Sequence, residues 1–196
     1  MEKAVREELA EAARLQQAVA AELVDDIARA AGMWLDTLRG GGMIAFCGSG
    51  GSAAQCQHLA TELISRFRRD RCAYRALALT TDTSILSAIG NDFGFEQAFA
   101  RQVEGLMRAG DLLVLMSTSG DSQGCLLAAQ QAWSQGVATL GLTGESGGQL
   151  KPVVDLCLCV PSSDTARVQE AHLCIGHILC GLVEGELSAA ELKPDA

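Results

Sequence analysis

The stretch that decides the fold is Leu112-Leu-Val-Leu-Met-Ser-Thr-Ser-Gly-Asp-Ser122, where five apolar residues run into a cluster of hydroxyl groups and a glycine. The apolar run predicts a buried strand, and Ser122 is placed to begin a helix. A helix start offers unpaired backbone N–H groups and a positive dipole end, and serine and threonine hydroxyls add donors. The turn is therefore either a seat for a phosphate group or an ordinary N-capped connection.

Other parts of the chain repeat this alternation of strand and helix. Apolar runs predict strands at 43–47, 75–80, 137–142 and 156–160, and helices are predicted at 52–68, 84–89, 95–107, 122–135 and 164–187, with a loop at 90–94 and a frayed tail after Ser188. Strands that are apolar on both faces and alternate with helices predict an α/β fold, a three-layer α/β/α sandwich with a central parallel sheet. Ligands of such folds bind beyond the carboxyl ends of the strands. The turns at 48–52 and 117–122 should therefore face the same edge of the sheet.

The first 42 residues are predicted to be helical. Apolar residues recur at helical spacing over 3–39, a second helix can begin at Asp25-Asp26, and Gly40-Gly-Gly42 would end it. We expect residues 1–42 to form an N-terminal helical arm that packs partly on its own sheet and partly on another subunit. Residues 43–196 would form the sheet domain, with both parts in one structural unit.

Composition excludes several classes of partner. The chain has 196 residues, 48% of them hydrophobic, and a net charge of −9, which disfavours nonspecific binding to nucleic acid or to an anionic membrane. An anionic substrate would need a local pocket of donors. None of the eight cysteines forms a C-x-x-C pair, and from the pattern of the sequence we expect neither a secretory leader nor a membrane-spanning run. We therefore expect a cytoplasmic protein with reduced thiols.

Two helices carry a set of polar groups that could do chemistry. His58 and Glu62 are spaced i, i+4 on one helix face, one turn past the glycine turn. Gln169 and His177, eight residues apart in the last helix, differ by about 80° and can share a side. These groups could bind a divalent metal such as zinc, act as a general acid and base, or, for His58 and Glu62, form a surface pair. His172 lies about 140° from His177 and is interpreted as a structural histidine.

A carboxylate beside an imidazole, near a seat for phosphate, suits one reaction class. Proton transfer between adjacent carbons of a sugar phosphate through an enediolate needs a base for the carbon and an acid for the oxygen. The sequence contains no dinucleotide fingerprint, and this reaction needs no redox cofactor.

Several blocks in the same order resemble a known family. Ser117-Thr-Ser-Gly-Asp-Ser122 resembles the sugar-phosphate turn of the SIS (sugar isomerase) domain. With it, Cys47-Gly-Ser-Gly-Gly-Ser52, His58-Leu-Ala-Thr-Glu62, Gly90-Asn-Asp-Phe-Gly-Phe95 and Arg167-Val-Gln-Glu-Ala-His-Leu-Cys-Ile-Gly-His177 resemble the phosphoheptose isomerases, which act on sedoheptulose 7-phosphate. The resemblance covers nearly the whole chain and makes residues 43–196 an SIS domain.

The resemblance implies a role for each matched residue. Glu62 would be the catalytic base and His177 its acid/base partner. One zinc per subunit would be bound by His58, Glu62, Gln169 and His177. Substrate would be contacted by Ser49, Gly50, Gly51, Glu62, Asn91, Asp92, Ser117, Thr118, Ser119, Ser122 and Gln169. The family usually has asparagine at the position of Ser49, and a serine reaches less far and lacks the second amide group.

The resemblance also implies the assembly and the pathway. The family forms a cytoplasmic homotetramer with active sites between subunits, and its product, D-glycero-D-manno-heptose 7-phosphate, supplies bacterial ADP-heptose or GDP-heptose for lipopolysaccharide and other surface glycans. The main alternative is a non-enzymatic DiaA-like protein that binds the replication initiator, and the presence of both Glu62 and His177 favours the enzyme. A transcriptional regulator would need a DNA-binding module that the short, acidic N-terminal segment cannot supply. A different sugar-phosphate isomerase is the third alternative.

Overall fold

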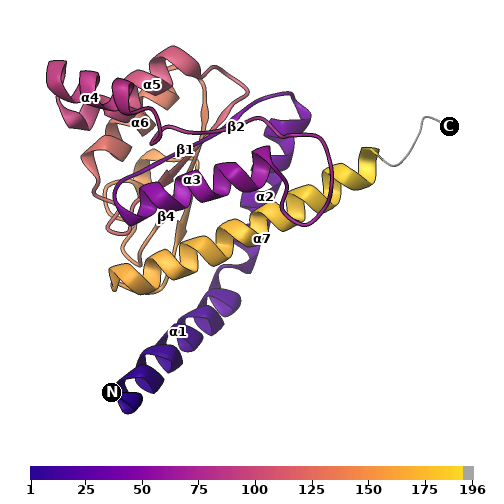
Figure 1. Ribbon diagram of the computed structural model, residues 1–196, viewed down its shortest axis with the longest axis vertical. Helices are drawn as coiled ribbons and strands as arrows, with labels where there is room; N and C mark the ends of the chain where they lie inside the picture. Colours follow the sequence, from indigo (N-terminus) through magenta and orange to yellow (C-terminus); the bar gives the residue numbers. More distant parts are fainter. Residues whose placement is uncertain (192–196) are drawn as a thin grey trace.

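A five-stranded sheet between two layers of helices forms the body of the molecule in the computed structural model, which describes residues 1–191 (Figure 1). In chain order the elements are α1 (Glu2–Glu22), α2 (Val24–Arg39), β1 (Ile44–Gly48), α3 (Gly51–Ile64), β2 (Ala76–Ala78), α4 (Thr83–Asp92), η1 (Phe95–Gln97), α5 (Ala98–Leu106), β3 (Leu112–Met116), α6 (Gln123–Ser134), β4 (Ala138–Thr143), η2 (Lys151–Val153), β5 (Leu156–Cys159) and α7 (Thr165–Glu191). This arrangement confirms the predicted α/β/α sandwich.

The strands lie in the order β2-β1-β3-β4-β5, and all described pairs are parallel. At the centre of the sheet Ile44 of β1 is opposite Leu112 of β3, which is opposite Ala138 of β4. Every residue of β1 and β3 is buried. Burial on both faces is the reason that these strands read as uninterrupted apolar runs.

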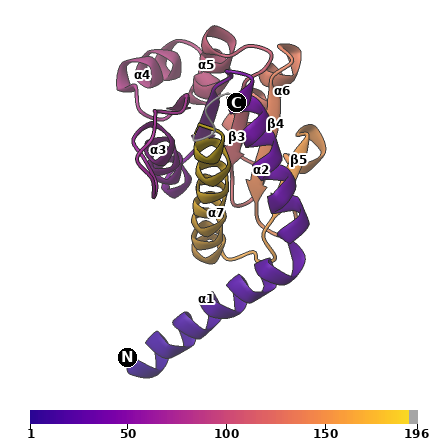
Figure 2. The same ribbon diagram turned by 90° about the vertical axis from the view of Figure 1, so that its right-hand side faces the viewer.

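Alternate residues of the central strands supply two separate cores. Ile44 and Phe46 pack with α2, α3 and α7, whereas Ala45 and Cys47 pack with α5 and α6. Figures 1 and 2 show α4, α5 and α6 gathered on one side of the sheet and α2, α3 and α7 on the other. Trp34 of α2 is fully buried against Phe46, with ring centroids 5.5 Å apart, so the second N-terminal helix belongs to the core of the domain.

Helix α1 extends away from this body (Figure 2). Within the described chain only Leu15 and Val19 are buried among its residues, while Val5 and Leu9 are 57% and 66% exposed. The predicted helical arm is therefore present, and its first half carries apolar side chains that no other described residue covers.

The structure corrects several predicted element boundaries. Helix α3 ends at Ile64 and not at residue 68, because the backbone N–H groups of residues 67–69 bond to Glu184 of α7. Helix α4 continues to Asp92, so residues 90–92 are helical and not part of a loop. Strand β2 has only three residues. Helix α7 continues through residues 189–191, where fraying was predicted, and the remainder of that tail lies outside the described residues.

Among the described helices, none combines the length and the apolar character that crossing a membrane requires.

Candidate active site

Two turns lie at the carboxyl edge of the sheet, where the connections that follow β1 and β3 go to opposite faces. Gly48, the last residue of β1, pairs with Met116, the last residue of β3, so the turns that follow start at the same level. The first turn leads into α3 on one face and the second into α6 on the other. A crevice at such a switch point is the usual ligand site of an open parallel sheet. The prediction that both turns share one edge is therefore confirmed.

The turn at 117–122 is organised by its own hydroxyl groups. The Gly120 N–H donates to the carbonyl and to Oγ of Ser117 at 3.0 and 3.2 Å, and the Asp121 N–H donates to Ser119 Oγ at 3.1 Å. Ser122 occupies the N-cap position of α6, but within the described chain its side chain makes no capping hydrogen bond. The ordinary N-cap interpretation of this turn therefore does not hold, and the donors of the first turn of α6 remain available to an anion.

The turn at 48–51 is equally open. Gly50 is the N-cap residue of α3 and has no side chain with which to cap it, and Ser49 is exposed. Gly51 is packed directly against Gln169 of α7, because a Cβ atom at Gly51 would lie 2.6 Å from Oε1 and 2.7 Å from Nε2 of that side chain. The structure therefore brings the amide of Gln169 to the glycine turn.

Helices α3 and α7 lie side by side and run in the same direction (Figure 1). Gln55 of α3 donates from Nε2 to the carbonyl of Gln169 at 2.6 Å near the start of α7. Two turns further along, Leu59 packs against Gly176, where a Cβ atom would lie 2.5 Å from Leu59 Cδ2. The missing side chain at Gly176 allows the two helices to approach closely at this level.

Just beyond this contact, three of the predicted functional side chains meet. Nε2 of His58 lies 2.8 Å from Nε2 of His177 and 3.3 Å from Oε1 of Glu62. The two rings meet edge to face, with centroids 5.1 Å apart. The side chain of Glu62 is 18% exposed and that of His58 is 44% exposed, so the carboxylate is the more enclosed group. An i, i+4 surface pair alone would not have a second imidazole from another helix directed at it.

This cluster has the donor set of a metal site. One ligand atom each from His58, Glu62 and His177 lies within 4.8 Å of the others. Two imidazoles and one carboxylate are the protein ligands of several catalytic zinc sites. The fourth predicted ligand, Gln169, lies two turns earlier on α7, with its amide against Gly51. The three residues fit a divalent metal by chemistry and by position.

Two predicted substrate residues lie on a different helix. Asn91 and Asp92 are exposed in the last turn of α4, where Asn91 Nδ2 donates to Asp92 Oδ1 at 2.8 Å. None of the residues of α4 is buried within the described chain. Among the described residues no hydrogen bond or ion pair joins this pair to the cluster on α3 and α7, so these two groups of residues remain separate within one chain.

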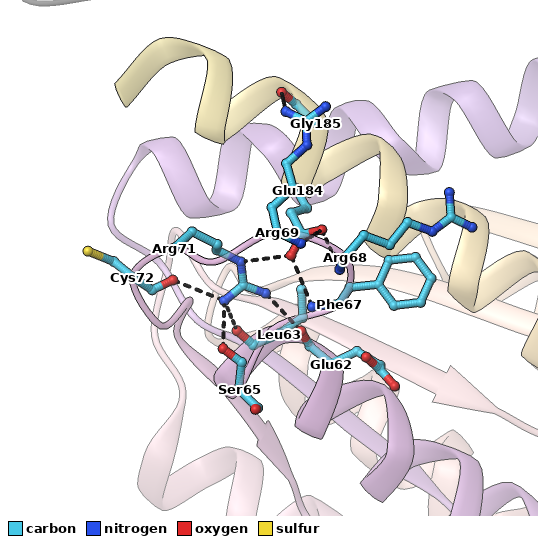
Figure 3. Close-up of polar contacts among 10 residues, drawn as sticks. All are labelled: Glu62, Leu63, Ser65, Phe67, Arg68, Arg69, Arg71, Cys72, Glu184 and Gly185. Atoms are coloured by element: carbon cyan, nitrogen blue, oxygen red, sulfur yellow. Dashed lines mark hydrogen bonds and ion pairs between the residues drawn. The ribbon is translucent and has the colours of Figure 1, made fainter. Parts of the chain in front are cut away.

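The polar network beneath the cluster joins Glu184 of α7 to partners that the sequence did not identify. The carboxylate of Glu184 accepts hydrogen bonds from the backbone N–H groups of Phe67, Arg68 and Arg69 at 3.0, 2.7 and 3.0 Å (Figure 3). Arg71 Nε lies 3.3 Å from the same carboxylate. Burial acts to raise the pKa of Glu184, but the three N–H donors and then Arg71 outweigh it and hold this pKa below its ordinary value.

One signal of this network was present in the sequence. Glu184 falls seven residues after His177, which places it on the same face of the last helix and within an apolar run. A carboxylate in such a position needs a partner. Nothing in the sequence pointed to Arg71 as that partner.

His172 is structural, as its helical angle predicted. It is fully buried, and Nε2 lies 3.1 Å from the carbonyl oxygen of Thr143. Burial lowers the pKa of His172 to about 4, and the bond to Thr143 only partly opposes this effect. The imidazole therefore stays neutral near pH 7, away from the His58–His177 pair.

Comparison with known proteins shows the family. The profile of the SIS domain matches residues 9–144. The phosphoheptose isomerase of Akkermansia muciniphila is 52% identical over 167 residues, which are 85% of this chain and 88% of that protein. The chain belongs to the phosphoheptose isomerase family of SIS-domain proteins.

Solved structures of phosphoheptose isomerases have the same fold. Phosphoheptose isomerase GmhA from Neisseria gonorrhoeae superposes with a TM-score of 0.89 at 40% identity, covering 94% of this chain and 98% of that one. The phosphoheptose isomerase from Francisella tularensis gives a TM-score of 0.90 at 34% identity, covering 93% and 97%. The SIS profile ends before α7, whereas these phosphoheptose isomerases match over nearly the full chain.

Proposed function

We propose that this protein is a ketose–aldose isomerase that converts sedoheptulose 7-phosphate to D-glycero-D-manno-heptose 7-phosphate. The observation that carries the proposal is the convergence of His58, Glu62 and His177, which lie on the helix that follows the open glycine turn and on the helix packed against it. The close relatives named phosphoheptose isomerase support the choice of substrate. The product would enter bacterial ADP-heptose or GDP-heptose biosynthesis, and through it lipopolysaccharide.

In this mechanism Glu62 and His177 divide the proton transfers. The carboxylate of Glu62 takes the proton from C1 of the ketose, and the electron pair of that C–H bond forms the C1=C2 double bond of an enediolate whose O2 oxygen then gains a proton. His177 gives that proton and removes one from the O1 hydroxyl. Glu62 then returns its proton to C2, so the product is an isomer and no electrons enter or leave. The enclosed position of Glu62 suits a base that must reach carbon and not water.

Zinc, bound by His58, Glu62, Gln169 and His177, is part of the proposal. When bound, it would polarise the carbonyl of the sugar. Glu62 cannot be a tightly bound ligand and a free base in the same step, so metal binding by this carboxylate would compete with its role as base. His58, which faces both Glu62 and His177, would keep the two groups close in either state.

The two turns would hold the rest of the sugar phosphate. Ser117, Thr118, Ser119 and Ser122 would bind the phosphate group with hydroxyl groups and the start of α6. Ser49, Gly50, Gly51 and Gln169 would contact the sugar near the start of α3, and Asn91 and Asp92 would do so from α4. The shorter side chain of Ser49, where the family usually has asparagine, leaves more room on this side of the sugar.

We infer that the active form is a cytoplasmic homotetramer with active sites between subunits. Apolar side chains stand exposed beside the cluster, where a groove of about 690 Å³ is lined by His177, Ile178, Leu182 and Arg68 among others. Ile178 and Leu182 are 42% and 46% exposed, and Val5 and Leu9 of α1 are exposed further along. Patches of this kind are typical of surfaces that another chain covers. The cytoplasmic location is inferred from the cysteine pattern of the sequence, which favours reduced thiols.

The direct test is incubation with sedoheptulose 7-phosphate and detection of the aldose heptose phosphate. We expect Glu62→Gln to reduce turnover by about 10²- to 10⁴-fold, the usual contribution of a general base, while the oligomeric state by light scattering stays unchanged. Glu186→Gln is a suitable control, because Glu186 lies on α7 with its side chain 66% exposed and 3.9 Å from Arg39. Turnover of Glu62→Gln at the wild-type rate would exclude Glu62 as the base. A wild-type protein without turnover would favour the non-enzymatic DiaA-like alternative.

A further inference from the structure

The last turn of α3, which carries Glu62, is held by a buried arginine. Arg71 donates from Nη2 to the carbonyl of Glu62 and from Nη1 to the carbonyl of Leu63, both at 2.8 Å, and from Nη1 to the carbonyl of Cys72 at 2.9 Å (Figure 3). The side chain of Arg71 is only 1% exposed. A cation that bonds the final carbonyls of a helix both satisfies them and complements the helix dipole.

The partner of this arginine, Glu184, fixes the loop that follows α3. Its carboxylate accepts from three consecutive backbone N–H groups, those of residues 67–69, and its side chain is 3% exposed. These bonds set the direction in which Phe67 leaves the backbone. The loop therefore depends on one carboxylate from α7 for its conformation.

Phe67 in turn contacts the second proposed catalytic group. Its ring stacks on the imidazole of His177, with centroids 5.6 Å apart and planes 16° from parallel. His177 is thus held between Phe67 on one face and His58 at its Nε2 atom. An unbroken series of contacts leads from Glu184 through Phe67 to His177, and from Arg71 to the backbone of Glu62.

We propose that Arg71 and Glu184 are positioning residues of the active site: this one ion pair sets both the last turn that carries Glu62 and the phenylalanine that orients His177. The inference rests on the proposed acid/base roles of Glu62 and His177. Stability alone is a weak reason for a buried ion pair, since well-packed apolar residues often serve as well. Apolar residues could not bond the Glu62 carbonyl or the three N–H groups of the loop.

The test is Glu184→Gln in the full-length protein, read by kinetics and by NMR. The amide removes the charge and offers only one acceptor oxygen to three donors. We expect kcat to fall about 10- to 100-fold with KM changed less than about twofold, since the two ligand turns are untouched and only the reacting groups are displaced. A purely structural role would lower the amount of folded enzyme and leave kcat per folded site unchanged.

The NMR measurement is independent of activity. With histidine labelled at ¹³Cε1, the chain gives three signals, because it has three histidines. The ring current of Phe67 should shift the His177 signal upfield in the wild type, and Glu184→Gln should abolish this shift while the buried His172 signal stays in place. Glu186→Gln, two residues further along α7 on the exposed side, should change neither kcat nor any histidine signal.

A second variant covers the case in which Glu184→Gln fails to fold. Phe67→Leu keeps the backbone N–H that bonds Glu184 but removes the stacked ring, and it should lower kcat about 10-fold and move the His177 signal. Wild-type kcat in folded Glu184→Gln, or in Phe67→Leu, would overturn the proposal. If the wild type does not isomerise sedoheptulose 7-phosphate but the His177 signal responds as expected, the proposed function fails while the positioning of His177 by the ion pair stands.

Discussion

Replacing Gly51 with alanine should separate the function of the glycine turn from its contribution to stability. Gly51 is the first residue of α3, so alanine fits its backbone. The new Cβ would lie 2.6, 2.7 and 2.9 Å from Oε1, Nε2 and Cδ of Gln169. Non-bonded carbon atoms rest about 3.5–4.0 Å apart, so the amide must retreat by about 1 Å. The displaced group is the end of a flexible side chain, and we expect the free energy of unfolding to change by less than about 1 kcal/mol.

The effect on activity should be much larger than the effect on stability. A displacement of about 1 Å in a group that contacts substrate or metal can cost about 10²-fold in rate. Steady-state isomerisation of sedoheptulose 7-phosphate by Gly51→Ala, compared with urea unfolding of the same protein, measures both quantities. Gly105→Ala is the matched control, because a Cβ at Gly105 of α5 would meet nothing within 4 Å.

A double-mutant cycle identifies the route of this effect. If Gly51→Ala acts by moving Gln169, then Gln169→Ala and the double variant should show the same reduced kcat/KM, because the contact has already been lost. Additive losses would show that Gly51 matters through its own approach to the ligand. Wild-type activity of Gly51→Ala would refute the placement of Gln169 in the site.

Three further results are expected. Ser122→Ala should raise KM about tenfold, but it should cost less stability than the roughly 1 kcal/mol lost with a true N-cap serine, because Ser122 makes no capping hydrogen bond. Asp82→Ala should show the full cost of a lost cap, because the Asp82 carboxylate accepts from the Ile85 N–H of α4 at 2.9 Å. Equal losses of stability in the two variants would contradict this. His172→Leu should keep activity and should flatten the pH dependence of urea unfolding. In the wild type the unfolded imidazole binds a proton below about pH 6.5, whereas the folded one binds it only below about 4. The free energy of unfolding of the wild type should therefore fall by about 3 kcal/mol as the pH drops through this range. A chelator should remove one zinc per subunit, as measured by metal analysis, and the activity should be lost with the metal. Undiminished turnover by the metal-free protein would show that the ion is incidental.

The sheet was predictable from sequence because its strands are buried on both faces. Runs such as Leu112–Met116 have no polar alternation, and that pattern between amphipathic helices admits few architectures. The end of α3 was not predictable in the same way. It is set by hydrogen bonds to Glu184, which lies 117 residues beyond Phe67. A local pattern of residues cannot predict a partner so distant in the sequence.

The individual residues of the candidate site could be predicted from the sequence, but their arrangement in space could not. Helical spacing placed His58 beside Glu62 and put His177 on the last helix, and family resemblance joined them. The 2.8 Å approach of the two imidazoles depends on how closely two helices pack, a quantity that periodicity does not contain. The stack of Phe67 on His177 likewise follows from the fold of a loop.

The contact between Gly176 and Leu59 has a consequence for the mutations that the chain can tolerate. Every amino acid other than glycine carries a Cβ atom, so any missense change in the Gly176 codon would displace the buried side chain of Leu59 from its place between α3 and α7, one residue before His177. A genetic screen would record such alleles as losses of catalysis, although residue 176 is not among the residues proposed to bind substrate or metal. On exposed helices such as α1, random substitutions would pass unnoticed in the same screen unless they fall where another chain packs.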